Sequence, residues 1–330
     1  MSTSKPSATI AAPALDRAAN SRVHTLGMLT LAITLTAWSF GPTLSARVTT
    51  YPLVSTFSRM VGAAGIQWVI VLLARIAPTR AMLKRAFIPG ALFCVNNVLF
   101  FIAIRNANIA SATLLTSLQP VVVLLLAKPL FGEVIRLWQV ICTIVALGGA
   151  AVAVIGANSA GRSQPTSWIG ALAAIGSMFT FCGYFLLSKH ANSRPDQAPP
   201  HPLTYITAVI TGSAVTSVPF VLLSGHLDQL AHLTMTQLRA LSLVVVVPSI
   251  GHVALMFTHR HVEASVSSLI LLLQPISSAL VAWWILDQRL VGAQMIGGFV
   301  VVAAIAAVTL RKGPVVQALP PEDVLRNPVS

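Results

Sequence analysis

The chain has 330 residues, of which 55% are hydrophobic and only 9% are charged, and its mean hydropathy is +0.81. A soluble domain usually carries roughly 25% charged residues, so this composition excludes an ordinary globular protein and predicts an all-α integral membrane protein. A net charge of +13 would suggest nucleic acid as a partner of a soluble protein. Here the basic residues fall in short connections, so we expect the lipid bilayer, and not nucleic acid, as the partner.

Apolar runs of about 20 residues, long enough to cross a bilayer, follow one another along the chain. Before the first run, residues 1–22 are rich in Ser, Ala and Pro and are expected to form a disordered tail, and residues 311–330 are expected to form a second one. The ten predicted transmembrane helices span residues 24–46, 52–74, 86–105, 109–131, 137–156, 168–188, 202–224, 239–259, 264–286 and 292–310.

Lys and Arg are distributed unequally between the two sides of this arrangement. With a cytoplasmic N-terminus, 15 of the 21 basic residues lie inside, 5 lie outside, and Arg59 lies within a span. Basic residues of short loops stay on the cytoplasmic side. The bias therefore predicts a multi-pass protein of the inner (plasma) membrane with both termini in the cytoplasm.

The two halves of the chain resemble each other. "RNANIASATLLTSLQP" from Arg105 aligns with "RHVEASVSSLILLLQP" from Arg260, and "PLVSTFSRMVG" from Pro52 aligns with "PLTYITAVITG" from Pro202. We predict two five-helix units, residues 23–156 and 167–310. Because five is odd, the second unit enters the membrane from the opposite side. Inverted repeats of this kind place a substrate site near the bilayer midplane and work by alternating access, so the pattern predicts a transporter of a small molecule.

A Gln-Pro pair stands inside the fourth and the ninth predicted span, at Gln119-Pro120 and Gln274-Pro275. Proline bends a helix, and a glutamine in hydrocarbon requires a polar partner. With Thr116 on the same face as Pro120, these residues either line a cavity or join neighbouring helices by hydrogen bonds.

Arg59 lies about 10 Å below the outer end of the second span, at the helical rise per residue. An arginine at such depth usually faces a partner or a wet cavity. We expect it to attract a carboxylate or phosphate of the substrate; the alternative is that it extends outward or fixes a neighbouring helix.

The pair Asn96-Asn97 and His252 occupy corresponding positions near the middle of their spans. All eight acidic residues lie in tails, connections or helix ends, so His252 is the mid-span group that would carry protons if transport is proton-coupled. Trp38 and Tyr184, in the first helix of each half, either stack on a substrate or serve packing.

Enzyme motifs are missing, and the three cysteines show no spacing typical of a metal site. We therefore expect no catalytic residues, no cofactor and no metal. The sequence leaves a homodimer open.

A helix ending in "LQP", then "FGE" at 131–133 and "QVICTIVALGGAAVAVIG" at 139–156, resembles the EamA-type repeat of the drug/metabolite transporter superfamily. Trp38-Ser39-Phe40 and Pro52 with Arg59 are similar to that family as well. The resemblance implies ten helices, with helices five and ten at the periphery, and the outward transport of small metabolites. We expect an exporter of amino acids or amino-acid-like compounds; the alternatives are a drug or nucleotide-type efflux carrier and a membrane-embedded enzyme or lipid-handling protein.

The halves depart from each other at two charged positions. Glu133 of "FGE" aligns with Gln288, and Arg59 aligns with Val209. The two halves are therefore chemically unequal, and symmetry assigns no role to either residue.

Overall fold

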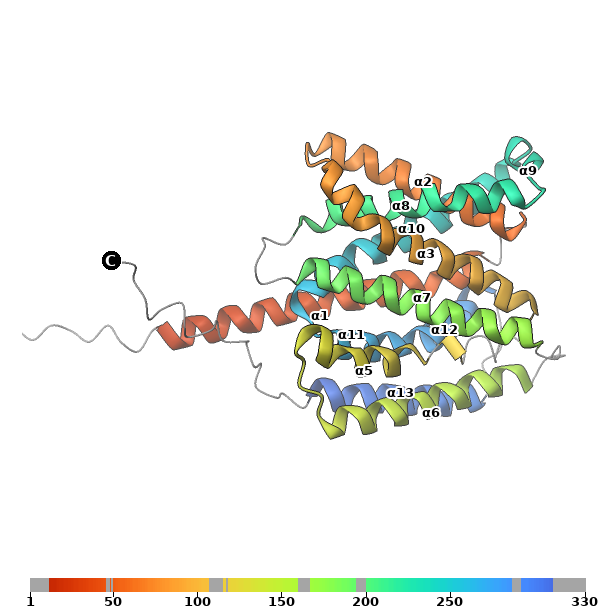
Figure 1. The fold of residues 1–330 in the computed structure, drawn as a ribbon. Coiled ribbons are helices and arrows are strands. Elements are labelled where there is room, and N and C mark those ends of the chain that lie inside the picture. Colours follow the sequence, from red (N-terminus) through yellow and green to blue (C-terminus); the bar gives the residue numbers. More distant parts are fainter. Residues whose placement is uncertain are drawn as a thin grey trace, which may run out of the picture.

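The computed structural model describes residues 12–45, 48, 50–106, 115–116, 118–159, 167–193, 200–286 and 292–310, and helices are the only regular elements in these ranges. They are α1 (Ala12–Ser45), α2 (Pro52–Leu73), α3 (Arg80–Asn106), α5 (Gln119–Phe131), α6 (Leu137–Ser159), α7 (Trp168–Asn192), α8 (Pro202–Leu223), α9 (Asp228–Ala231), α10 (Met235–His261), α11 (Ala264–Ile270), the 3₁₀ turn η1 (Leu271–Leu273), α12 (Gln274–Leu286) and α13 (Gly292–Leu310). The long helices lie side by side in one bundle (Figure 1).

Local sequence explains where several helices begin. Both α2 and α8 open on a proline, which lacks one of the N–H donors that have no partner in the first turn of a helix. At α7 the hydroxyl of Ser167 accepts a hydrogen bond from the N–H of Gly170 at 3.1 Å. At α10 Thr234 and Gln237 form a capping box, and this helix begins at Met235, four residues before the predicted start of the eighth span.

The N-terminal boundary differs from the prediction. Helix α1 begins at Ala12, so residues 12–22, which were expected to belong to a disordered tail, are helical. This stretch contains several alanines, the strongest helix formers, and extending an existing helix is much easier than nucleating one. The span therefore continues beyond its apolar part, and α1 projects from one end of the bundle in Figure 1.

Six helices within the described ranges are long and apolar enough to cross a membrane: Leu53–Leu73, Arg80–Ala103, Trp168–Asn192, Pro202–Leu223, Met235–His261 and Ala264–Ile285. Four shorter apolar helices, Thr25–Gly41, Gln119–Phe131, Leu137–Val152 and Met295–Ala307, correspond to the other predicted spans. Large apolar side chains such as Leu73, Ile88 and Phe299 are exposed on the outside, as in a protein surrounded by lipid. The all-helical membrane architecture is confirmed, whereas ten crossings stay a prediction.

The packing of the helices repeats between the two halves. The first and third helices of one half pack against the third and first of the other, as α1 with α10 and α3 with α7. Helices α2 and α8 pack on each other, and so do α6 and α13, which lie together at one edge of the bundle (Figure 1). Exchanging each of these helices for its counterpart in the other half therefore reproduces the same pairs.

Hydrogen bonds between helix ends fix the relative direction of the halves. The hydroxyls of Thr30, early in the apolar part of α1 (Thr25–Gly41), and Thr258, late in α10, lie 3.0 Å apart. Ser193, just after α7, donates to the carbonyl of His259 at 2.6 Å. The apolar part of α1 thus begins at the end of the bundle where α7 ends, so the first helices of the two halves run in opposite directions, as an inverted repeat requires.

Small residues allow the halves to approach closely. A Cβ atom added at Gly90 of α3 would lie 2.3 Å from the carbonyl oxygen of Val209 in α8. The hydroxyl of Ser213 in α8 donates to the carbonyl of Gly90 at 2.7 Å. Contacts through glycine and serine are typical of helix pairs in membranes.

Both Gln-Pro pairs stand where an α-helix begins. Helix α5 starts at Gln119 after a turn at Leu118, and α12 starts at Gln274 after the 3₁₀ turn η1. A continuous helix with a kink was expected around Pro120, but the structure places this proline in the first turn of α5, where no helical hydrogen bond is lost. Most of residues 109–117 of that predicted span lie outside the described residues.

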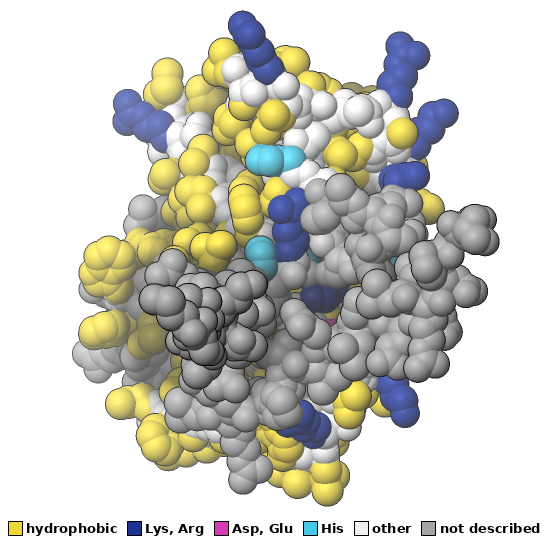
Figure 2. All heavy atoms as spheres, turned by 90° about the vertical axis from the view of Figure 1, so that its left-hand side faces the viewer, with side chains coloured by type: hydrophobic (Ala, Val, Ile, Leu, Met, Phe, Trp, Pro, Cys, Tyr) yellow, Lys and Arg dark blue, Asp and Glu magenta, His cyan; other side chains and the backbone are white. Residues whose placement is uncertain are grey.

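One end of the bundle is rich in basic side chains. Figure 2 shows Lys and Arg around the face that carries the start of α1. The exposed basic residues at this end are Arg75 in the connection after α2, Arg80, Lys84 and Arg85 at the start of α3, and Lys128 near the end of α5. This is the end that the positive-inside rule assigns to the cytoplasm.

Candidate functional site

Aromatic rings from both halves meet in the centre of the bundle. The ring of His252 in α10 lies 4.7 Å, centroid to centroid, from Trp38 of α1 and 4.7 Å from Phe93 of α3. Tyr184 of α7 lies 4.8 Å from Phe93, and Phe181 of α7 lies 5.9 Å from Trp38. We call these five side chains the central cluster. It joins α1 and α3 of the first half to α7 and α10 of the second.

His252 is held by a hydrogen bond within the central cluster. The Tyr184 hydroxyl lies 3.1 Å from the Nδ1 atom of His252, and the tautomer of the imidazole decides which group donates. Trp38 and His252 are 6% and 4% exposed. A proton from solvent therefore reaches His252 only if the helices around the cluster move apart.

Gly251 brings α10 close to Trp38. A Cβ atom at this position would lie 2.6 Å from the Cδ1 atom and 2.7 Å from the Nε1 atom of the Trp38 ring. The neighbouring Thr34 donates to the carbonyl of Gly251 at 3.1 Å. The missing side chain of Gly251 is thus what lets the indole and the imidazole of His252 lie against each other.

Arg59 adds a positive charge beside the central cluster. Its Nη1 atom donates to the Oδ1 atom of Asn97 at 3.3 Å. The side-chain amide of Asn97 in turn donates to the backbone carbonyl of Phe93, one turn earlier in α3, at 2.8 Å. Arg59 also acts electrostatically on His252. Arg59 and Asn97 are both half-buried. This places a guanidinium from α2 next to aromatic rings from both halves.

The predicted site residues divide into two groups. Trp38, Tyr184 and His252 belong to the central cluster, whereas Asn97 is bonded to the Phe93 carbonyl and Arg59 is linked to the cluster through Asn97.

Asn96 lies apart from them, because neighbouring helix positions face different directions. Its amide donates at 2.9 Å to both the carbonyl and the hydroxyl of Ser177 in α7, so it joins two helices. None of the contacts that define the cluster involves Thr116, Gln119 or Gln274, which are half-buried. The backbone carbonyl of Gln119 accepts a hydrogen bond from the Cys182 thiol of α7 at 3.8 Å.

Sequence reasoning missed Phe93 and Phe181, because an aromatic residue in an apolar helix gives no signal of its own. It also read Lys189 as one of the basic residues of a connection. The structure buries Lys189 at 7% exposed, with its ammonium donating to the carbonyls of His259 and Val262 at the end of α10. The proximity of Lys189 to helix α10 was not visible in the sequence.

A narrow space between the halves lies away from the central cluster. It lies between α5, α6 and α11, and the gaps between its lining side chains do not admit a water molecule. Sites for small molecules usually measure about 300–1,000 Å³, so this space is too small for a metabolite. In the part of the chain that the structure describes, no group of three or more His, Cys, Asp or Glu residues could hold a metal ion.

The residue types in and beside the central cluster suit a small organic anion. A guanidinium can bind a carboxylate through two parallel hydrogen bonds, and aromatic faces can cover the apolar part of the same molecule. Since the groups come from α1, α2, α3, α7 and α10, any movement of one half against the other changes their spacing.

Comparison with known proteins agrees with this architecture. The model of the EamA-like transporter family matches residues 25–155 and 168–310, one match for each half. No curated protein matches the sequence. Among solved structures, one described only as a crystal structure of a protein superposes with a TM-score of 0.70 at 18% identity, covering 88% of this chain and 97% of its own. At this identity the likeness supports the fold alone.

The family match covers most of the chain and both repeats, and it agrees with the apolar helices and their exchangeable packing. The chain therefore belongs to the EamA-like transporter family, within the drug/metabolite transporter superfamily, and it is a transmembrane transporter and not an enzyme.

Proposed function

We propose that the protein is an alternating-access carrier that exports a small metabolite carrying a carboxylate, an amino acid or an amino-acid-like compound. It crosses the inner (plasma) membrane ten times and keeps both termini in the cytoplasm. The positive-inside bias and the basic end of the bundle in Figure 2 support this orientation.

The observation that carries the proposal is the position of Arg59 beside the central cluster. Within the described ranges, the hydrogen-bond partner of Arg59 is the neutral amide of Asn97, and no carboxylate pairs with it. A half-buried cation without an anionic partner is expensive in a membrane. A substrate carboxylate would supply the missing charge, while Trp38 and His252 would cover its side chain.

A drug or nucleotide-type efflux carrier is the second candidate, because a guanidinium also binds phosphate. Proton coupling through His252 belongs to the proposal as well, since its imidazole pairs with Tyr184 inside the cluster. The experiment below separates these alternatives.

The test is uptake of a radiolabelled panel into proteoliposomes with and without a pH gradient. The panel contains amino acids, other small carboxylates, nucleotides and cationic drugs. We expect wild-type protein to take up a carboxylated compound and Arg59→Gln to raise its KM about tenfold or more, the usual scale for one lost charge-assisted hydrogen bond. Arg80→Gln, which removes an exposed positive charge far from the cluster, should leave the KM unchanged.

His252→Ala separates coupling from packing. If the gradient drives wild-type uptake and the variant transports without responding to the gradient, His252 carries the coupling. Uptake of nucleotides in preference to amino acids would favour the second candidate. Equal KM values for Arg59→Gln and wild type would contradict the assigned role of Arg59.

A further inference from the structure

A carboxylate from the first half is bound to a helix of the second half at the basic end of the bundle. Glu133 lies in the connection after α5, and its carboxylate accepts hydrogen bonds from the N–H of Ala264 at 2.7 Å, the hydroxyl of Ser265 at 2.7 Å and the N–H of Ser265 at 3.3 Å. These donors are the first two residues of α11. The contact spans 131 positions of sequence and crosses the boundary between the repeats.

Glu133 takes the capping role that the local sequence of α11 leaves open. The residue that precedes α11, Glu263, makes no side-chain capping hydrogen bond. The first N–H groups of a helix carry partial positive charge and lack partners within it. An ionised carboxylate satisfies them with stronger hydrogen bonds than a neutral acceptor does. The cap of α11 is therefore supplied by the other half of the protein.

Lys189 ties the same region to two further helices. Its buried ammonium, at the end of α7, holds the last carbonyls of α10. Lys189 also interacts electrostatically with the carboxylates of Glu133 and Glu263. The charges at this end thus form a group that crosses the repeats, with Glu133 and Arg136 from the first half and Lys189 and Glu263 from the second.

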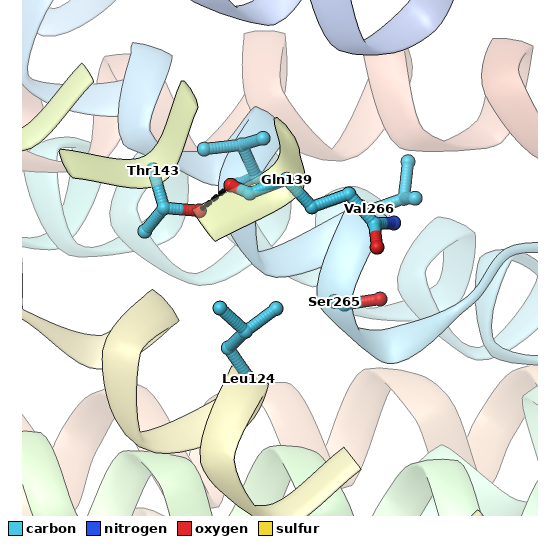
Figure 3. Close-up of a pocket in the computed structure, with 6 residues that line it drawn as sticks. Leu124, Gln139, Thr143, Ser265 and Val266 are labelled. Atoms are coloured by element: carbon cyan, nitrogen blue, oxygen red, sulfur yellow. Dashed lines mark hydrogen bonds between the residues drawn. The ribbon is translucent and has the colours of Figure 1, made fainter. Parts of the chain in front are cut away.

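The narrow space described above lies directly behind this contact. It is lined by Leu124 of α5, Gln139 and Thr143 of α6, and Ser265, Val266 and Leu269 of α11 (Figure 3). Ser265 both binds Glu133 and lines the space. If α11 moved away from the α5–α6 connection, the hydrogen bonds to Glu133 would break and the space would widen at its basic end.

We propose that Glu133 and Ser265 form a latch, the Glu133–Ser265 latch, that holds the cytoplasmic end of the bundle closed between the two halves. The proposal rests on the alternating-access function, because it assigns the latch to one of the two ends that such a carrier opens in turn. The charge of the latch has no counterpart in the aligned sequence, since the residue aligned with Glu133 in the second half is the neutral Gln288, which lies outside the described residues.

Cysteine accessibility tests the latch without measuring transport. In full-length protein with Cys94, Cys142 and Cys182 replaced by Ala, Leu124→Cys places a thiol on the narrow space, at a position that is 8% exposed. The rate of its modification by N-ethylmaleimide reports how often the space opens. We expect Glu133→Gln to raise this rate about tenfold, because a neutral amide caps α11 more weakly. We expect Ser265→Ala to raise it less.

Glu263→Gln is the matched control. It removes the same charge at the same end but no capping hydrogen bond, so the labelling rate should stay unchanged or fall. A thiol at Leu31, which is 0% exposed in the core, must stay unmodified in every variant, which separates opening of the latch from unfolding.

Two results would overturn the latch: a rate for Glu133→Gln within twofold of its parent, or an equal acceleration by Glu263→Gln. The double variant gives a second check. If Glu133 and Ser265 act in one contact, adding Ser265→Ala to Glu133→Gln should raise the labelling rate little further. If Glu133→Gln accelerates labelling but the protein transports nothing in the uptake test, the latch stands and only the carrier proposal is contradicted.

Discussion

Glu263 shows how single charges are balanced at the basic end of the bundle. Its side chain is exposed in the short connection between α10 and α11. Burial of part of the side chain, and then the neighbouring carboxylate of Glu133, raise the pKa of Glu263, while the positive charges of Lys189 and Arg136 oppose this shift. The ionised form of Glu263 is therefore less favourable in the folded protein than in the unfolded chain.

This direction predicts a pH-dependent effect of Glu263→Gln. An acid whose pKa is raised by folding contributes stability below its ordinary pKa, and that contribution is lost as the pH rises through the raised value. At pH 7.5 we expect Glu263→Gln to unfold at a slightly higher temperature than wild type, and at pH 4 we expect no gain. Because Glu263 is exposed, the change in unfolding free energy should stay below about 1 kcal/mol.

Thermal unfolding in detergent at the two pH values measures this difference. A variant that is less stable than wild type at pH 7.5 would show that the attraction to Lys189 outweighs burial and the repulsion from Glu133.

Single polar residues in apolar spans were visible in the sequence, but their partners were not. Arg59, Asn97 and His252 stand out because each is polar in an apolar stretch. The bond between Tyr184 and His252 joins residues 68 positions apart, and nothing in either stretch predicts it. Glu133 was set aside because it lacks a symmetric counterpart, yet its partner Ser265 is 132 positions away in the other half.

At the scale of helices, the contact between α1 and α10 positions the central cluster. Three features hold it: the Thr30–Thr258 hydroxyl pair, the bond from Thr34 to the Gly251 carbonyl, and the missing side chain of Gly251 beneath Trp38. The two hydrogen bonds fix the register of the helices, and Gly251 sets the distance between their axes.

Gly251→Ala should displace Trp38 from His252. The added Cβ atom would lie 2.6 Å from the indole, and overpacking of this kind destabilises by about 1–3 kcal/mol. We expect a lower unfolding temperature and a several-fold loss of transport.

Gly65→Ala is the control for this substitution, because nothing lies within 4 Å of a Cβ atom at Gly65 in α2. The unfolding temperature and the uptake rate are measured for both variants and compared. Equal behaviour of Gly251→Ala and Gly65→Ala would show that the close approach at Trp38 is not required.

Helix starts were predictable where the sequence carries a local signal, and helix breaks were not. Pro52 and Pro202 mark the first residues of α2 and α8 because proline is favoured in a first turn. The start of α1 was placed too late because hydropathy marks the membrane-crossing part of a helix and not its polar extension. The 3₁₀ turn before Gln274 has no local signal, because it consists of three leucines that are equally compatible with an α-helix.

At the scale of the whole molecule, the inverted halves form one bundle, and both halves contribute side chains to its central cluster. Their counterpart helices have exchangeable neighbours and run in opposite directions. Chemistry breaks this symmetry at two positions: Arg59 faces the centre with Val209 as its counterpart, and Glu133 closes one end with Gln288 as its counterpart. In the proposed alternating-access cycle, the shared packing would provide two related states, and the unequal charges would give them different energies.

The measurement that tests the central claim most directly is counterflow in proteoliposomes. Vesicles are loaded with an unlabelled carboxylated compound from the panel and diluted into a trace of the same compound carrying a radiolabel. A carrier that exposes the Arg59 site to one side at a time should concentrate the label transiently inside, and Arg59→Gln should abolish this overshoot while Arg80→Gln preserves it. Label that only equilibrates, at a rate independent of the internal compound, would contradict alternating access.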